Sequence, residues 1–404
     1  MKKRLWAVVL VGLFLTLAVT GCWGKREVED LGFVLAIGVD QGDNPDQYDV
    51  TYQMAIPKKG AQGPDMQDLT ITTTGISIRG SLEKVFTLSS RQPFVGTVKI
   101  LVIGEEAAKQ GINKFLDFFQ RYYEFRRTTY LVMTRGKAQD LLNIKIRAEK
   151  FPALVLQAYM NQKEMTSTFP VVRLGHYLTV LATGSTAPVI PVVSTVKPGE
   201  ADIKYKPEQE GAPEELRIAG VGVFNGDKLA GYLSEQETRG YMWLRNEAQQ
   251  RFLCTELDDG GEHYFTSGRV TATSTKMKLE KSNGSYGMHY TVNFTGDVDE
   301  FSWKPEKRTP EQWYQDAAGI TKSAFEKLVR SECEAAVSRS KEMDLDFLGV
   351  GRLIEEKDPA YWHQIKDRWQ ARLPEFPVTV DVDYHPENAG GSFNPPVNPP
   401  GTGT

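Results

Sequence analysis

The sequence is poor in cysteine and, beyond its first twenty residues, has no long apolar run. Only Cys22, Cys254 and Cys333 occur in 404 residues, too few for a scaffold held together by disulfides. Their spacing does not match a metal site. No later apolar stretch approaches the roughly 20 residues of a membrane-spanning helix. These absences exclude a disulfide-rich scaffold and a multi-span membrane protein, and they indicate a body that folds in water.

An excess of basic charge is also missing. The chain has 48 basic and 52 acidic residues, and three of the basic ones, Lys2, Lys3 and Arg4, precede the first apolar run. The rest of the chain is therefore more acidic still. A chain without a basic excess has no bias towards polyanions. We expect no nucleic-acid partner.

The motifs of common enzyme classes are absent as well. There is no H-E-x-x-H, Walker A or G-x-S-x-G sequence. The glycines of residues 220–226 lie in and at the turn of a predicted hairpin, which argues against a phosphate-binding loop. Asp258 and Asp259 lie in a predicted turn, where solvated carboxylates are usual. The histidines are scattered: His176, His263, His289, His363 and His385. The sequence predicts no catalytic residue, no cofactor and no metal site.

Two cysteines have patterns typical of packed side chains. Cys254 alternates with Phe252 in a predicted strand, and Cys333 continues the helical row of Phe325 and Val329. Cysteine that packs in this way behaves as a small hydrophobic residue. We predict that both thiols are reduced and buried.

The chain begins with the layout of a secretory signal peptide. Lys2, Lys3 and Arg4 precede an apolar stretch over residues 5–19, and the small residues Thr20 and Gly21 follow. The apolar stretch is too short to span a bilayer comfortably. We interpret residues 1–21 as a signal peptide that is removed.

The residues around the predicted cleavage site resemble the bacterial lipobox. In that motif a cysteine thiol receives diacylglycerol and cleavage then leaves the cysteine as the first residue. Val19, Thr20 and Gly21 before Cys22 fit it. Two acyl chains hold a protein stably on a membrane, at ~0.8 kcal/mol per buried methylene. We predict that Cys22 is a lipid anchor; the alternative is an ordinary signal peptide with a chance cysteine.

The first part of the mature chain alternates predicted strands and helices. Residues 22–140 are expected to form a mixed α/β domain, and residues 141–200 a smaller, mainly helical one. At the end of the latter, Pro188 and Pro191 favour an edge strand over a central one. Residues 201–215 are charged and contain prolines, as is typical of a linker.

The remaining chain has signals for antiparallel strands and one long helix. Asn225-Gly226 predicts a tight hairpin, and Ser234 with Glu237 predicts a capped helix start. A long helix is expected from about residue 310 to 343. Residues 216–385 therefore predict a C-terminal α+β domain, and residues 386–404 a disordered tail rich in proline and glycine. The predicted fold class is α+β, multidomain, with a C-terminal domain rich in antiparallel hairpins.

Six segments carry a family resemblance. They are Cys22-Trp23 with Glu27, "AIGVD" (36–40), "RQPFVGTVKILVIG" (91–104), "GVGVFNGDKLAGYLSEQETRGYMWL" (220–244), "LDFLGVGRLIEEKDPAYWHQIKDRW" (345–369) and "FPVTVDVDYH" (376–385). In this order they resemble the Ger(x)C family, the C subunits of spore germinant receptors in spore-forming Gram-positive bacteria. Gly24 departs from the family, which commonly has aspartate after Cys-Trp.

The resemblance implies a lipoprotein on the outer face of the spore inner membrane, built from three mixed α/β domains. It also implies association with an integral-membrane A subunit and a transporter-like B subunit, and no enzymatic activity. Germinant molecules trigger such receptors; direct binding of the germinant by this subunit is left open. The alternative is a solute-binding lipoprotein of a transporter. Such proteins have two similar α/β lobes, whereas the two halves of this chain differ, so we favour the receptor subunit.

Overall fold

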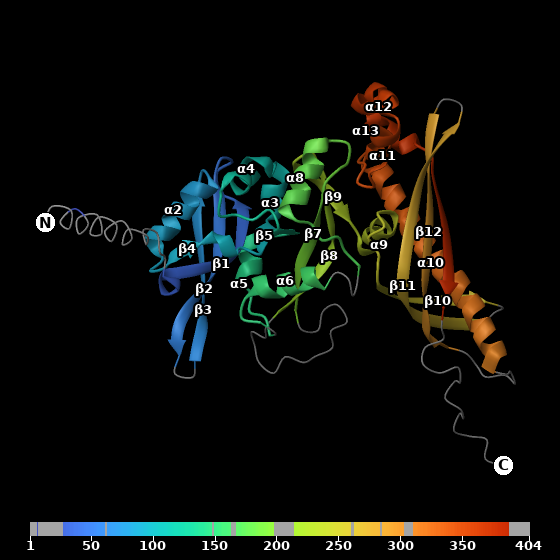
Figure 1. Ribbon diagram of the computed structural model, residues 1–404, viewed down its shortest axis with the longest axis horizontal. Helices are drawn as coiled ribbons and strands as arrows, with labels where there is room; N and C mark the ends of the chain where they lie inside the picture. Colours follow the sequence, from blue (N-terminus) through green and yellow to red (C-terminus); the bar gives the residue numbers. More distant parts are fainter. Residues whose placement is uncertain are drawn as a thin grey trace, which may run out of the picture.

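Two β-sheets lie side by side along the long axis of the molecule (Figure 1). The computed structural model describes residues 6, 27–60, 63–147, 149–162, 167–197, 214–259, 262–282, 285–302 and 310–387. Helices and strands occur in both halves, and the predicted α+β fold is confirmed. Within the described ranges, no helix combines the length and the hydrophobicity needed to cross a bilayer.

The first sheet has a parallel centre and a hairpin at each end. Its strands run in the order β3-β2-β1-β5-β6-β7-β8-β9, and β4 also pairs with β1. Pairing is parallel from β1 to β7 and antiparallel beyond them on either side. The strands are β1 (Leu31–Gln41), β2 (Tyr48–Gly60), β3 (Gly63–Gly75), β4 (Gln92–Phe94), β5 (Ile100–Ile103), β6 (Tyr130–Thr134), β7 (Val189–Val196), β8 (Glu215–Asn225) and β9 (Lys228–Leu233).

Helices cover both faces of this sheet, because its central strands are apolar on both sides. In β5, Leu101 and Ile103 join one apolar cluster, while Ile100 and Val102 join the other. Buried parallel strands need this continuous hydrophobicity. One face is covered by α2 (Ile78–Leu88), α3 (Glu105–Gln110), α4 (Asn113–Arg121) and α8 (Leu174–Thr183). The other is covered by α5 (Ala138–Asn143) and α6 (Pro152–Asn161).

Strand β7 corrects one expectation. Its prolines favoured an edge position, but β7 lies inside the sheet between β6 and β8. The pairing register of β7 with β8 shifts between Pro191 and Val193. An irregularity of this kind accommodates a residue that has no N–H to donate. The surrounding residues Val189–Val193 are all buried, so burial on both faces outweighs the cost of the proline.

The predicted hairpin at Asn225-Gly226 is confirmed as β8 and β9, with Gly226 at φ 62°. These two strands come at the end of the expected linker, residues 201–215, most of which lies outside the described residues. Even so, β8 pairs with β7, which precedes the linker. The first sheet therefore includes strands from both sides of residues 201–215. The division of the chain into domains stays a prediction.

The second sheet consists of a long hairpin flanked by two further strands, in the order β10-β11-β12-β13. Helix α10 packs against this sheet and, at 33 residues, is about 50 Å long. β13 returns parallel to β12. The strands are β10 (Arg251–Asp259), β11 (Glu262–Ser282), β12 (Ser285–Phe301) and β13 (Val378–Pro386), and the long helix is α10 (Pro310–Glu342). The expected disordered tail lies outside the described residues, apart from Pro386 and Glu387.

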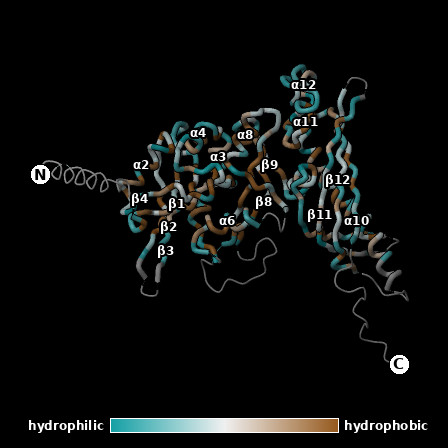
Figure 2. Tube along the Cα trace, in the orientation of Figure 1, coloured by the Kyte–Doolittle hydropathy of each residue, from teal (hydrophilic) through white to brown (hydrophobic). Residues whose placement is uncertain are grey.

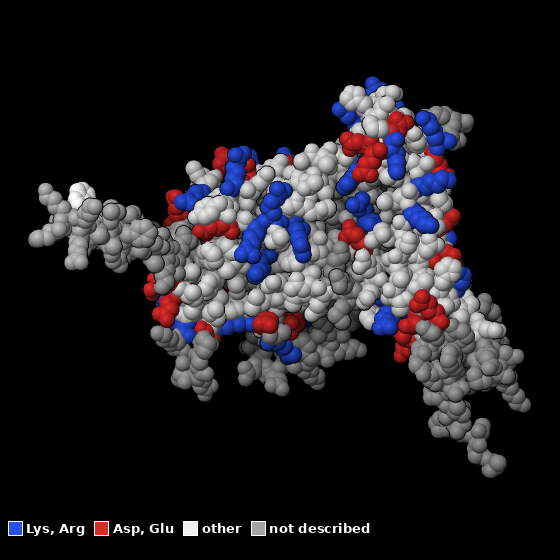
Figure 3. Space-filling view, viewed as in Figure 1, with Lys and Arg blue, Asp and Glu red and all other residues white. Residues whose placement is uncertain are grey.

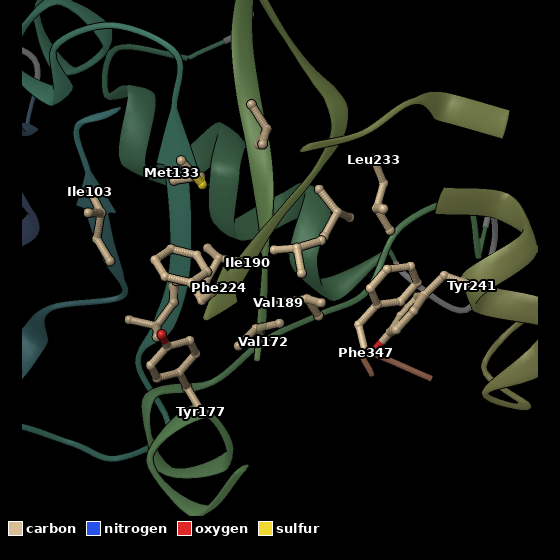
Figure 4. Packing of buried hydrophobic residues seen from close by; sticks show 14 of the residues in the cluster. Ile103, Met133, Val172, Tyr177, Val189, Ile190, Phe224, Leu233, Tyr241 and Phe347 are labelled. Carbon is tan, nitrogen blue, oxygen red and sulfur yellow. The ribbon is translucent and has the colours of Figure 1, made fainter. Parts of the chain in front are cut away.

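Helix α9 (Glu235–Leu244) joins the two sheets. Its predicted capping box is confirmed, since the Ser234 hydroxyl accepts a hydrogen bond from the Glu237 backbone and the Glu237 carboxylate accepts one from the Ser234 backbone. α9 packs on α10. Figure 4 shows the apolar cluster continuing from the first sheet, through Tyr177 and Phe224, to Tyr241 and Phe347 at this junction. The two sheets therefore share one core.

Short helices complete the molecule. They are α11 (Val350–Lys357), α12 (Pro359–Ile365) and α13 (Trp369–Arg372), together with the 3-10 turns η2 (Val28–Asp30), η3 (Val95–Thr97), η4 (Lys366–Arg368) and η5 (Leu373–Glu375). α11 and α12 form a projecting, largely hydrophilic end beside the second sheet (Figure 2).

Candidate functional site

The predicted lipidation site, Cys22 with Val19, Thr20 and Gly21, lies outside the described residues. The continuous described chain begins at Glu27, passes through η2 and enters β1. Arg91 holds this start in place: its guanidinium donates to the backbone carbonyl of Glu29 and lies 3.9 Å from the Asp30 carboxylate. In the chain, the predicted anchor therefore comes a few residues before the first described strand. This strand starts at the end of the first sheet where α2 and β4 lie (Figure 1).

The two thiols of the body differ in exposure. Cys333 is buried as predicted, and burial raises the pKa of its thiol. Cys254 is exposed, so the prediction for it is wrong. It does share a face of β10 with Phe252, but that face meets solvent, and Phe252 is 66% exposed while Leu253 is buried. Both cysteines are free thiols.

The histidines do not converge. His263 Nδ1 lies 2.9 Å from Asp258 on the exposed end of the β10–β11 hairpin, and this hydrogen bond raises the pKa of the imidazole. His289 contacts Thr379 across β12 and β13, and His385 lies 3.0 Å from Asp383. Among the described residues, no three His, Cys, Asp or Glu side chains are grouped so that they could hold a metal ion.

Two buried aspartates serve as helix caps. Asp40 accepts hydrogen bonds from the backbone N–H groups of Ala138 (2.7 Å) and Gln139 (2.9 Å), at the start of α5. Asp346 accepts three from residues 349–351 at the start of α11, and a fourth from Trp369 Nε1 at 3.1 Å. Burial raises the pKa of both carboxyls, and the hydrogen bonds act in the opposite direction. These acids belong to the architecture.

A third buried acid, Glu332 of α10, links this helix to α9 and to β10. Both of its oxygens accept hydrogen bonds from Arg251 of β10, at 2.9 and 3.0 Å. From α9, Arg239 donates to it at 2.6 Å and Trp243 Nε1 at 2.9 Å. A buried carboxylate needs this number of donors to offset its loss of hydration. Sequence reasoning missed all three acids. The donors to Asp40 and Glu332 are distant in the chain, whereas Asp346 caps a helix that begins only a few residues later, a local signal that could have found it.

A cleft of about 490 Å³ lies between the first sheet and the C-terminal helices. Its walls come from the connection between α8 and β7, the turn between β8 and β9, and α11–α13. The backbone N–H of Ala187 donates to the Asp346 carbonyl at 2.8 Å and ties the walls together. Trp362, Trp369 and Lys366 line the cleft, as does the Ser185 hydroxyl, which is buried and has no hydrogen-bond partner in the described structure. This arrangement can bind a molecule, and it lacks a paired nucleophile and base.

Two family descriptions match consecutive parts of the chain. "Spore germination protein N-terminal domain" matches residues 24–195, and "Spore germination B3/GerAC like, C-terminal" matches residues 219–390. Relatives in Bacillus subtilis (strain 168) include spore germination protein KC, 29% identical over 98% of both chains. Spore germination protein B3 is 25% identical over 94% of this chain and 97% of its own.

The crystal structure of the GerBC protein has a similar fold, with a TM-score of 0.53 and 20% identity. The match covers 90% of this chain and 100% of that one. The likeness extends over both sheets, as the two consecutive family matches also do. This chain therefore belongs to the GerAC-like, or Ger(x)C, family of spore germination proteins.

Proposed function

We propose that this protein is the lipid-anchored C subunit of a spore germinant receptor, needed for nutrient-triggered germination and assembled with membrane A and B subunits. The observation that carries the proposal is the pair of consecutive family matches. Relatives of nearly the same length, among them spore germination proteins B3 and A3, support it. The place of action is the outer face of the spore inner membrane.

The architecture fits a subunit that binds partners. The three buried acids that resemble catalytic groups in isolation, Asp40, Glu332 and Asp346, are all occupied by structural hydrogen bonds. The two sheets also differ in size and pairing. A solute-binding lipoprotein would have two similar lobes around its ligand, so the receptor role is favoured over that alternative.

The anchor is tested by Cys22→Ala. This change removes the thiol that would receive diacylglycerol, and the lipobox peptidase then loses its modified substrate. Confinement to a membrane raises effective concentration beside partners by about 100-fold or more. We therefore expect Cys22→Ala spores to lack lipid label on this protein and to germinate poorly through its receptor.

Cys254→Ser is the matched control, because it changes an exposed cysteine of the body and should leave lipid labelling and germination intact. Normal germination of Cys22→Ala spores without any lipid on the protein would contradict the role of the anchor. Unchanged lipid labelling would contradict the assignment of Cys22.

Assembly is tested by purification from detergent-solubilised spore membranes. A tag on this protein should recover a multi-span protein with a large soluble domain and a transporter-like protein, in fixed proportion. Recovery of this chain alone after mild crosslinking would contradict assembly with A and B subunits.

A further inference from the structure

We propose that the end of the first sheet formed by η2 and α2 rests directly on the phospholipid bilayer. The contact is made by a membrane-facing surface, defined as the side chains of Val28, Ile76, Phe86 and Leu88. The inference rests on the proposed lipidation of Cys22 and adds an orientation to it: the first sheet meets the bilayer and the second sheet points away.

These four apolar side chains are exposed to solvent, and the core is filled without them. The exposed fractions are 62% for Val28, 77% for Ile76, 42% for Phe86 and 65% for Leu88. α2 already buries a separate apolar row of Ile78, Leu82 and Val85 against the sheet. Large apolar side chains gathered outside a core mark a surface that meets another phase or partner.

The four residues belong to one end of the molecule. Ile76 directly precedes the helix cap Ser77, while Phe86 and Leu88 occupy the last turn of α2. Val28 lies in η2, which Arg91 ties to the segment that leaves α2. Figure 1 shows α2 and β4 at the end where the chain begins, with the second sheet at the opposite end.

The anchor keeps the start of the described chain close to the bilayer. Five peptide units separate Cys22 from Glu27, and a fully extended chain spans at most ~3.6 Å per residue. Glu27, the residue directly before η2, therefore lies within about 18 Å of the lipidated residue. That distance keeps Val28, at the start of the first sheet, close to the headgroup region.

The surroundings of the surface suit a lipid interface. A groove of about 610 Å³ lies between α2 and α4, where apolar Ile76, Phe118 and Tyr122 line it together with five charged residues, Asp46, Arg79, Lys114, Asp117 and Arg121. The next residue, Tyr123, is 81% exposed. Within α2, Arg79 pairs with Glu83 at 3.2 Å and Lys84 donates to the backbone carbonyl of Thr74. Figure 3 shows basic and acidic side chains together at this end, so the contact is shallow and interfacial.

The test uses the lipidated protein in vesicles of phosphatidylethanolamine and phosphatidylglycerol. In a Cys254→Ser background, a polarity-sensitive dye is attached at Leu88→Cys or at Phe252→Cys. Leu88, on α2 beside the first sheet, and Phe252, in β10 of the second sheet, have nearly equal exposure, 65% and 66%. Cys333 is buried and should remain unlabelled under native conditions.

We expect the dye at position 88 to shift to the blue, to be quenched by a lipid-borne quencher and to become several-fold less accessible to iodide. The dye at position 252 should remain aqueous. The double variant Phe86→Glu/Leu88→Glu should keep its melting temperature, since both residues are exposed. A dye attached at Ile76→Cys in this double variant should lose the blue shift.

Flotation of the vesicles separates this inference from the one on which it rests. If the protein does not float, lipidation fails and the orientation fails with it. If the protein floats but the dyes at positions 88 and 252 are equally aqueous, the anchor stands and the membrane-facing surface is wrong. Shielding of position 88 only in membranes that contain the A and B subunits would also overturn it.

Discussion

At the residue scale, buried acids hold distant parts of this chain together. Glu332 has four donated hydrogen bonds from α9 and β10, and Asp40 and Asp346 each cap a helix. Asp40 and Asp346 lie in segments that resemble the Ger(x)C family, "AIGVD" and "LDFLGVGRL". Each of those segments therefore contributes an acid whose hydrogen bonds serve the architecture.

Removing the Glu332 carboxylate should be strongly destabilising. Glu332→Ala leaves Arg251 buried without a counter-charge, and Trp243 without its acceptor. Breaking one partner of a buried ion pair costs about 3–5 kcal/mol. Urea unfolding checks this, with Glu334→Ala, an exposed position on the same helix, as the control expected to change stability by less than about 0.5 kcal/mol. Equal effects of the two changes would refute the role given to Glu332.

The two thiols should differ in reactivity. In the native protein at pH 8, iodoacetamide should modify Cys254 and spare Cys333, because Cys254 is exposed while burial shields Cys333 and raises the pKa of its thiol. Cys333 should react once urea unfolds the chain. Mass spectrometry of the alkylated peptides measures both. Similar native rates at the two sites would show that α10 is packed less tightly than described.

At the element scale, the contact between α9 and α10 depends on a glycine. A Cβ at Gly240 would overlap the backbone carbonyl of Glu332 and press on Ala336. The two helices can therefore approach closely only where α9 has no side chain. The same approach brings Arg239 and Trp243 within hydrogen-bonding distance of Glu332.

Gly240→Ala should separate these helices and destabilise the protein by about 1–3 kcal/mol, as overpacking of a core does. Gly319→Ala is the matched control, since Gly319 is exposed on α10 and a Cβ there meets nothing within 4 Å. It should stabilise the protein by about 0.5–1 kcal/mol through helix propensity. Thermal unfolding distinguishes the opposite signs, and a loss of stability in both variants would contradict the packing argument.

At the scale of the whole molecule, the two sheets share one apolar cluster. α9 follows directly from the first sheet and packs on α10 of the second. The hydrogen bond from Ala187 to the Asp346 carbonyl adds a second junction beside the cleft. A shared core predicts cooperative unfolding of both sheets.

Hydrogen exchange should therefore report similar opening free energies for amides of β5 and β12, within about 1 kcal/mol under conditions of global unfolding. Arg239→Ala, which weakens the junction from its partly exposed side, should lower both together. Mass spectrometry of peptides from the two strands measures this. Early exchange of the second sheet alone would show two independent units.

The sequence by itself determined the local features. The Asn225-Gly226 turn, the capping box at Ser234 and the long helix α10 each arise from residues close together in the chain, so propensity and hydrogen bonding within a few residues suffice to predict them. The family resemblance likewise needed only short segments in a fixed order. The lipid anchor at Cys22 stays a prediction of the same kind.

Only the tertiary structure decided which side of a strand is buried and which partner a buried charge meets. Cys254 alternates as predicted, but alternation does not tell which face of β10 meets the core. β7 is central because both its faces are covered, despite its prolines. Asp40 binds Ala138 98 residues away, and Glu332 binds Arg251 81 residues away. Such contacts depend on how the chain folds back on itself, which no local pattern encodes.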